Sequence, residues 1–346
     1  MAGDIRDLFG IELPVVQAPM AGVQGAALAV AVSEAGGLGS LPCALLDPET
    51  LAAELAFIRE QTRRPFNVNF FCHAMPDEGR GDDPRWRDLL QPYYQEWGLE
   101  MGRAPTGALR RPFDEATAAL VEPFRPPVVS FHFGLPHEAL LARVRAWGAR
   151  ILSTATTPEE AEWLEQRGVD AIVLQGLEAG GHRGHFLRSG LEGQAALFDL
   201  LPRVAERVRV PVIAAGGIAD AADVRRALDL GAAGVQVGTA YLLCDEATTS
   251  PVHRRTLEAG DAPTAITNLF SGRPARAIVN RAMRELGPMI DAAPPFPLAA
   301  RLMGPLRSAA EKQGLGDFSP LWAGERYRAC RSLSAAELTR ALAAEA

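Results

Sequence analysis

The chain has 346 residues, of which 48% are hydrophobic and 22% are charged, and its formal net charge is −7. This length and apolar content are sufficient for a large core, and α/β barrels of this size commonly form a single domain. The acidic balance argues against nucleic acid as a partner, because phosphate binding needs a basic face. Lys312 is the only lysine, which argues against a barrel aldolase that forms a Schiff base on an inner strand.

Eight short apolar runs rich in Val and Ile alternate with helical segments, as expected for parallel strands buried on both faces. Several of the helical segments begin at Asp or Thr-Pro and end at Gly, which are favourable capping residues. The runs lie at 14–20, 37–42, 66–71, 127–133, 150–156, 170–176, 211–217 and 234–242. Their order predicts an α/β fold, a (β/α)8 TIM barrel. A doubly wound open sheet is the alternative, but no GxGxxG turn follows the first strand.

Two segments depart from the barrel pattern. More than fifty residues separate Phe71 from Pro126, which is too long for an ordinary connection. We interpret residues 74–126, approximately, as a helical insertion over the barrel mouth. The segment from about 245 to 346 is expected to be a helical C-terminal extension that packs over the same mouth. With no linker or repeat, residues 1–346 are predicted to form one domain.

The cysteines and the N-terminus indicate the compartment. The four cysteines are scattered, with no CxxC pair and no histidine at zinc spacing, so no metal site is predicted. The N-terminal residues lack the apolar segment of a signal peptide, and no uncharged run approaches the ~20 residues that span a bilayer. We therefore expect a cytoplasmic protein with free thiols and no membrane partner. The cysteines are Cys43, Cys72, Cys244 and Cys330.

Glycines follow the last two predicted strands, where barrels often bind phosphate. Strand 211–217 ends at Gly216 and Gly217, and strand 234–242 contains Gly238 and Thr239. Glycine lets backbone N–H groups approach a phosphate closely, and the threonine hydroxyl can donate a hydrogen bond. The alternative is that these glycines only form tight turns.

A glycine-rich loop after strand 170–176 contains the strongest candidate for catalysis. Gly180, Gly181 and Gly184 surround His182, which can donate, accept or titrate near neutral pH. The alternative is a loop histidine satisfied by backbone carbonyls. Arg183 is as well explained by a structural salt bridge as by a substrate contact.

Other polar side chains lie at the same ends of the strands. His132 ends strand 127–133, Asn69 lies in strand 66–71, and Gln175 ends strand 170–176. Asn69 and Gln175 can hydrogen-bond a heterocycle, but backbone partners would satisfy Asn69 equally well. His132 is equally well explained by packing among phenylalanines.

The first strand leads into the turn QAPMAG, residues 17–22. Pro19 and Met20 would form a stiff apolar wall, and Ala21 beside them is small. A flat aromatic ring could lie against this wall, although read alone it is an ordinary strand-to-helix turn.

Taken together, these motifs resemble the nitronate monooxygenase family, formerly the 2-nitropropane dioxygenases, and its bacterial class I branch in particular. The matching segments run in order through most of the chain. The AGGHRG and SFHFGLP sequences are the most specific of them, whereas the glycine turns are general to FMN barrels. Glu325 departs from the glutamine that the family often has at this position. The segments are QAPMAG (17–22), NVNFFCH (67–73), PYYQEWG (92–98), VVSFHFGLP (128–136), QGLEAGGHRG (175–184), PVIAAGGI (211–218), GVQVGTAYL (234–242) and PLWAGE (320–325).

The resemblance implies FMN as the prosthetic group. Its phosphate would lie between the loops after strands 211–217 and 234–242, and its ring against the first-strand turn. His182 matches the family's active-site histidine and His132 a second one. The residues expected to bind FMN are Pro19, Met20, Ala21, Asn69, Gln175, Gly180, Gly181, Gly217, Gln236, Val237, Gly238 and Thr239.

The implied reaction is the oxidation of an alkyl nitronate by O2 to a carbonyl compound and nitrite, with propionate 3-nitronate as the expected substrate and detoxification as the role. A protonated His182 would bind the nitronate anion, whereas a neutral one could deprotonate a nitroalkane. One alternative is an NAD(P)H-dependent FMN reductase acting on an enoyl thioester or a quinone. Another is a flavin-binding barrel without catalysis. The oligomeric state is not predicted.

Overall fold

Eight parallel strands form the centre of the protein. The computed structural model describes residues 3–102, 110–344 and 346. The strand order is β1-β9-β8-β6-β5-β4-β3-β2, and a parallel bridge between Val16 and Leu38 joins β1 to β2. The predicted barrel is therefore confirmed. The strands are β1 (Val15–Gln17), β2 (Gly39–Pro42), β3 (Phe66–Phe71), β4 (Val128–His132), β5 (Arg150–Ala155), β6 (Ala171–Gln175), β8 (Val212–Ala215) and β9 (Gly234–Val237).

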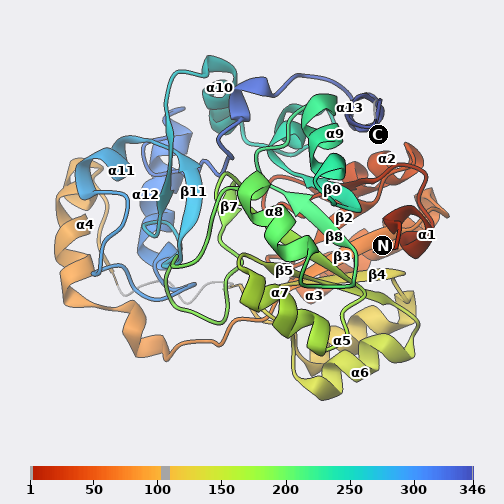
Figure 1. Cartoon of the computed structure of the whole chain (residues 1–346). Helices are drawn as coiled ribbons and strands as arrows, with labels where there is room; N and C mark the ends of the chain where they lie inside the picture. The colour runs from red at the N-terminus through yellow and green to blue at the C-terminus, as the bar shows by residue number, and fades with distance from the viewer. Residues whose placement is uncertain (1–2, 103–109, 345) are drawn as a thin grey trace.

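Helices surround the strands and shield their apolar side chains from water (Figure 1). Several begin with a side-chain cap, as the sequence indicates: Asp47 accepts from the N–H of Thr50, and Asp220 from that of Asp223. The last helix, α13, packs against α2 and α9, so the C-terminus returns to the barrel. The helices are α1 (Ile5–Phe9), α2 (Ala26–Glu34), α3 (Pro48–Gln61), α5 (Glu115–Val121), α6 (Glu138–Ala146), α7 (Pro158–Gln166), α8 (Leu197–Ala205), α9 (Ala221–Asp229) and α13 (Ala335–Leu342).

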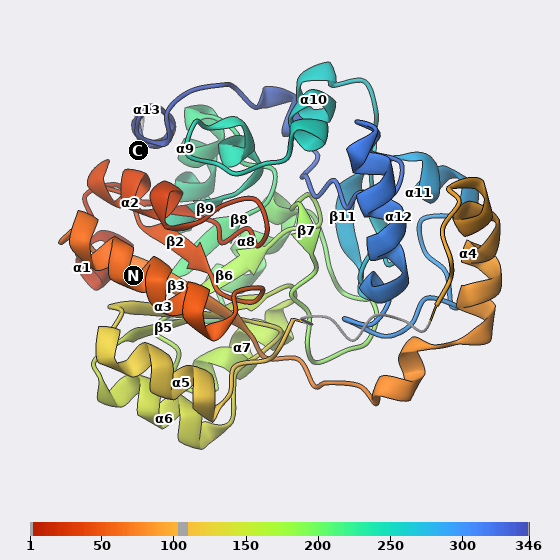
Figure 2. The ribbon, with the colours of Figure 1, turned by 180° about the vertical axis from the view of Figure 1, so that it is seen from behind.

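A second layer of helices lies beside the barrel and has its own apolar core (Figure 2). It combines α4, from the segment after β3, with helices that follow β9. Trp86 and Tyr94 of α4 are buried in this core, and the Tyr94 hydroxyl donates to the carbonyl oxygen of Leu302 at 2.7 Å. The helical insertion and the helical C-terminal extension are thus both present. The helices of this layer are α4 (Pro84–Glu96), α11 (Arg281–Leu286) and α12 (Ala300–Lys312). Helix α10 (Pro251–Ala259) lies outside this core and packs against the 3-10 helices at Thr239–Leu243 and Tyr327–Ala329.

The two halves of the segment after β3 have different positions. α4 packs against α12 in the second layer, whereas α5 packs between α3 and α6 in the ring of barrel helices. Short 3-10 helices occur in the same connection at Glu78–Gly81 and Glu122–Phe124, and near the C-terminus at Tyr327–Ala329.

A small antiparallel sheet, absent from the expectations above, joins the two layers. It contains β7 (Gly181–His182), β10 (Thr264–Thr267) and β11 (Ala275–Ile278) in the order β10-β11-β7. β7 is too short and too rich in glycine for the sequence to predict a strand. Its pairing with β11 fixes the backbone of the loop that carries His182.

The predicted strand 234–242 is too long. β9 ends at Val237, and Thr239–Leu243 form a 3-10 helix, η3. Gly238 separates them with φ −115° and ψ −73°, which is not an extended conformation. The chain therefore turns at Gly238 instead of continuing as a strand.

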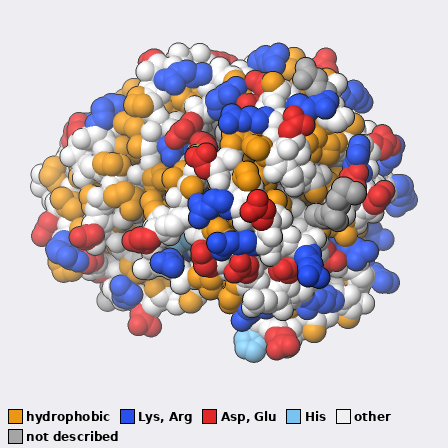
Figure 3. Space-filling view, in the orientation of Figure 1, with side chains coloured by type: hydrophobic (Ala, Val, Ile, Leu, Met, Phe, Trp, Pro, Cys, Tyr) orange, Lys and Arg blue, Asp and Glu red, His pale blue; other side chains and the backbone are white. Residues whose placement is uncertain are grey.

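The surface carries both signs of charge. On the face in Figure 3, basic and acidic side chains are interspersed among hydrophobic ones. In the part of the chain that the structure describes, no helix combines the length and apolarity needed to cross a membrane.

Candidate active site

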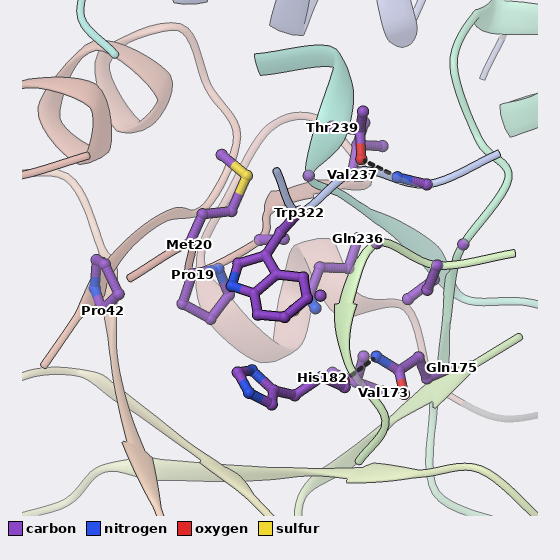
Figure 4. A pocket seen from close by; sticks show the side chains of 18 of the residues that line it. Pro19, Met20, Pro42, Val173, Gln175, His182, Gln236, Val237, Thr239 and Trp322 are labelled. Carbon is purple, nitrogen blue, oxygen red and sulfur yellow. Dashed lines mark hydrogen bonds between the residues drawn. The ribbon is translucent and has the colours of Figure 1, made fainter. Parts of the chain in front are cut away.

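The predicted site residues meet in one pocket at the carboxyl ends of the barrel strands (Figure 4). Every residue that the sequence analysis assigned to catalysis or to FMN lines this pocket. They come from the ends of β1, β3, β4, β6, β8 and β9 and from β7. Two arginines, Arg110 and Arg326, are the charged side chains among the lining residues that the structure describes, and no carboxylate joins them there.

His182 is held by contacts from both layers. Its Nε2 lies 2.9 Å from the hydroxyl oxygen of Ser271, which is buried. Its backbone carbonyl accepts from His132 Nε2 at 3.2 Å and from Gln175 Nε2 at 3.0 Å. In β7, His182 pairs with Ala275. Among the described residues none hydrogen-bonds to the Nδ1 atom of His182, so this nitrogen is available to a ligand.

The surroundings of His182 are aromatic. Its ring centroid is 5.2 Å from that of Phe296 and 5.2 Å from that of Trp322. Burial lowers the pKa of His182 well below its usual value, and the positive charge of Arg110 lowers it further. The imidazole is therefore neutral at physiological pH.

His132 has protein partners at both ring nitrogens. Nδ1 lies 3.0 Å from the hydroxyl of Thr154, and Nε2 is bonded to the carbonyl of His182. Burial lowers the pKa of His132 to about 3, so this ring is also neutral. A side chain at position 184 would clash, since a Cβ there would lie 2.8 Å from His132 Cε1; this explains the glycine of the loop.

Gln175 and Arg183 fix the remainder of the loop. The Gln175 amide donates to the carbonyl of His182 and accepts from the N–H of Gly184 at 2.9 Å. Arg183 is fully buried and does not line the pocket. It donates to the carbonyl oxygens of Gln175 and Gly176 and to the side chain of Gln194. Among the described residues, the contacts of Arg183 are therefore hydrogen bonds to neutral acceptors and not an ion pair.

Glycines let three backbone segments meet at the other end of the pocket. Gly217 has φ +70°, which favours glycine. A Cβ at Gly180 would lie 2.5 Å from the nitrogen of Gly324, so only glycine permits this approach. The N–H of Gly324 in turn donates to the Thr239 hydroxyl at 2.9 Å. Within the described residues, the N–H groups of Gly217 and Gly238 have no acceptor.

Asn69 offers one amide oxygen to the pocket. Its Nδ2 donates to the hydroxyl of Ser130 at 2.9 Å and to the Ser130 carbonyl at 3.2 Å. This orients the Oδ1 atom away from Ser130. The first-strand turn is also held, because the N–H of Met20 donates to the side chain of Gln24 at 3.1 Å.

Several residues of the site were not predicted from the sequence. Arg110 and Trp322 line the pocket, and Ser271 contacts His182. Trp322 belongs to the matching segment PLWAGE, which was a usable signal. Arg110 and Ser271 belong to no helix or strand, so no periodicity indicates that their side chains turn inward.

The sequence assigned no role to Glu325 or His73, and the structure shows what each side chain contacts. Glu325 forms an ion pair with Arg276 at 3.0 Å. His73 is buried beside Phe296, with ring centroids 4.7 Å apart, and does not line the pocket.

Comparison with known proteins gives a consistent family. The family model "Nitronate monooxygenase" matches residues 4–345. A nitronate monooxygenase of Pseudomonas aeruginosa is 40% identical, over 98% of this chain and 97% of that protein. The crystal structure of a nitroalkane oxidase from Streptomyces ansochromogenes is similar, with a TM-score of 0.89 and 42% identity over 99% of this chain and 97% of that one. FabK from Thermotoga maritima shares the fold, with a TM-score of 0.71 and 24% identity over 100% of this chain and 96% of that one. The predicted resemblance is thereby confirmed: the chain belongs to the nitronate monooxygenase family of oxidoreductases.

Proposed function

We propose that the protein is an FMN-dependent enzyme that oxidises alkyl nitronates with O2 and releases a carbonyl compound and nitrite. The observation that carries the proposal is the placement of His182. Its ring lies beside the aromatic rings of Phe296 and Trp322, with one nitrogen fixed by Ser271 and the other available to a ligand. A nitronate or nitroalkane needs such a group beside it, as hydrogen-bond donor or as base.

The residues of the pocket fit FMN. At one end, the unpartnered N–H groups of Gly217 and Gly238 and the hydroxyl of Thr239 suit a phosphate, because it accepts several hydrogen bonds. A Cβ at Gly238 would lie 3.2 Å from that of Ala18, so the glycine keeps this end open. Arg326 lines the same pocket and supplies positive charge, although Asp220 and Asp223 pair with it.

The middle of the pocket suits a flat heterocycle. Pro19 and Met20 supply an apolar wall, and the Oδ1 atom of Asn69 supplies an acceptor. The same space is lined by small or apolar residues and by one further amide. These are Ala21, Gly180, Gly181, Val237 and the amide Gln236. Gln175 contributes its second amide hydrogen. When bound, FMN would supply the electron acceptor that no side chain of this chain can provide.

The protein's own groups then bind, orient and exclude water. A neutral His182 with its proton on Nε2 presents a lone pair at Nδ1, which can take the α-proton of a nitroalkane. With the proton on Nδ1 it donates a hydrogen bond to a preformed nitronate. Trp322 and Phe296 flank the imidazole and cover part of its surface. Figure 4 shows His182 and Thr239 on opposite sides of the Trp322 ring.

His132 suits a positioning role. Both of its ring nitrogens are occupied by Thr154 and by the carbonyl of His182, so it has no free nitrogen for the substrate. Loss of its ring would release the backbone of the loop on which His182 stands. Together with Gln175, it fixes the carbonyl of His182.

The proposal is tested by oxygen consumption and nitrite release with propionate 3-nitronate, with no NAD(P)H present. We expect rapid uptake, with nitrite in proportion to it. With nitroethane, whose proton the imidazole must take, His182→Asn should lose at least about 100-fold in kcat/KM with flavin content unchanged, since acid–base groups contribute 10²–10⁴-fold. Absent uptake, together with anaerobic bleaching of the flavin by NADH or NADPH, would overturn the proposal in favour of a reductase. Bound flavin without either activity would indicate a flavin-binding protein.

We also propose a cytoplasmic location. All four cysteines are free, and Cys43 and Cys244 are buried. Free thiols are typical of a reducing compartment. The partners that this site fits are small molecules, namely a nitronate and O2.

A further inference from the structure

The two arginines that line the pocket differ in their partners. Arg326 pairs with Asp220 at 3.1 Å and with Asp223 at 3.3 Å. Arg110 has no such partner: among the described residues, the charged side chain that acts on it is Arg307, which has the same sign. Arg110 is half-buried. A cation partly removed from water is costly to maintain without a counter-charge, so an unpaired one beside a cavity indicates that a ligand supplies that charge.

Arg110 lies at the His182 end of the pocket. Its guanidinium carbon is 5.9 Å from the centroid of the Phe296 ring, and that ring is 5.2 Å from the ring of His182. Phe71, whose ring centroid is 6.1 Å from that of Phe296, also lines the pocket. The unpaired cation therefore stands near the proposed reaction centre, across an aromatic surface, whereas Arg326 stands near the glycine turns.

The charge of Arg110 persists at physiological pH. Burial lowers its pKa to about 10, and the like charge of Arg307 contributes to the shift. A group with this pKa is almost wholly protonated near neutral pH. A guanidinium offers a planar fork of donors that matches a carboxylate, so the preferred counter-ion is a carboxylate.

We propose that Arg110 is a specificity-determining residue, which binds a second anionic group of the substrate, a carboxylate, while the nitronate group lies at His182. This inference rests on the proposed function. The contact with Arg110 would select, among alkyl nitronates, those that carry a carboxylate a few bonds from the nitronate carbon. Phe71, which lines the pocket with its ring centroid 6.3 Å from that of His182, offers an apolar surface to a short aliphatic connection.

The test compares two nitronates that differ only at the far end. Propionate 3-nitronate carries a carboxylate where propyl 1-nitronate carries a methyl group. In Arg110→Met, we expect the KM for propionate 3-nitronate to rise roughly 10- to 100-fold, which is the loss of one charged hydrogen-bonded contact. The KM for propyl 1-nitronate and both kcat values should change less than about threefold, because Arg110 contacts the carboxylate end of the substrate and not the reacting atoms. Arg110→Lys should recover part of the selectivity.

Arg307→Met is the matched control. Arg307 is a nearby arginine that does not line the pocket and is paired with Glu311 at 2.8 Å. Its loss removes one positive charge from the same region, and selectivity should remain as in the wild type. If Arg110→Met weakens both nitronates equally or neither, or if Arg307→Met gives the same selectivity loss, the proposal is overturned.

A binding measurement separates this inference from the proposed function. If the wild type oxidises neither nitronate, the proposed function fails, and calorimetry with 3-nitropropionate and 1-nitropropane still tests Arg110. Tighter binding of the carboxylate compound in the wild type, abolished in Arg110→Met, supports the carboxylate site. Equal affinity of the wild type and Arg110→Met for 3-nitropropionate overturns the carboxylate site.

Discussion

Replacing Ser271 by alanine tests how His182 is protonated. The Ser271 hydroxyl is 1% exposed, lies 2.9 Å from His182 Nε2, and lies 3.4 Å from the carbonyl oxygen of Arg273. A hydroxyl that donates to this carbonyl accepts from Nε2–H. It therefore keeps the proton of the neutral ring on Nε2 and leaves the lone pair of Nδ1 for the substrate.

The magnitude follows from one buried hydrogen bond. A neutral hydrogen bond contributes about 0.5–1.5 kcal/mol, and the upper value corresponds to roughly tenfold. Abstraction of a proton from a neutral nitroalkane needs the Nδ1 lone pair, so Ser271→Ala should lower kcat/KM for nitroethane about tenfold. A preformed nitronate has already lost this proton. For ethyl nitronate the loss should stay within about threefold.

Initial rates of oxygen consumption with both substrates, on protein of equal flavin content, measure this difference. Ser153→Ala is the matched control, since Ser153 is equally buried in β5 but donates to the carbonyl of Gly134 at 2.8 Å. It should affect both substrates alike. Equal losses on the two substrates in Ser271→Ala would refute the assignment of the tautomer.

Three further predictions concern the architecture of the site. Gly180→Ala should lower the free energy of unfolding by about 2 kcal/mol and weaken flavin retention, because its Cβ would lie 2.5 Å from the Gly324 nitrogen; Gly304→Ala, which meets no atom within 4 Å, should not. Arg183→Met should cost about 3 kcal/mol in urea unfolding, because buried carbonyls lose their donor. The free energy of unfolding should fall below about pH 6.5, since buried histidines stay neutral in the folded state and gain protons on unfolding, by about 1.4 kcal/mol per pH unit for each. A flat profile between about pH 7 and pH 5 would contradict this. These histidines are His73, His132, His185 and His253.

The barrel and the glycine turns were predictable because they depend on local patterns. Buried parallel strands are continuous apolar runs, and Gly217 stands where a positive φ is required. His182 and Asn69 were identifiable because parallel strands bring their carboxyl ends to one face. The order of the strands is therefore sufficient to predict that these two residues lie on the same face of the barrel.

The contacts that refine the site are long-range, and the sequence does not indicate them. Ser271 reaches His182 only because β11 pairs with β7, and neither strand has a recognisable pattern. Arg110 lines the pocket from a position in the insertion that belongs to no helix or strand. Glu325 departs from the family pattern, yet the structure compensates for its charge with Arg276. Tertiary placement, and not residue type, decides each of these roles.

The arginines, and not the histidines, supply the positive charge of this pocket. The pKa of His182 is lowered by burial and by Arg110, so an imidazolium is not available to hold an anion near neutral pH. The unpaired guanidinium of Arg110 remains charged until about pH 10. The KM for propionate 3-nitronate should therefore stay constant between about pH 6.5 and pH 8.5 and rise only as Arg110 deprotonates. If His182 were the cation, the KM would instead rise through the range of an ordinary histidine, and steady-state kinetics across this range distinguish the two.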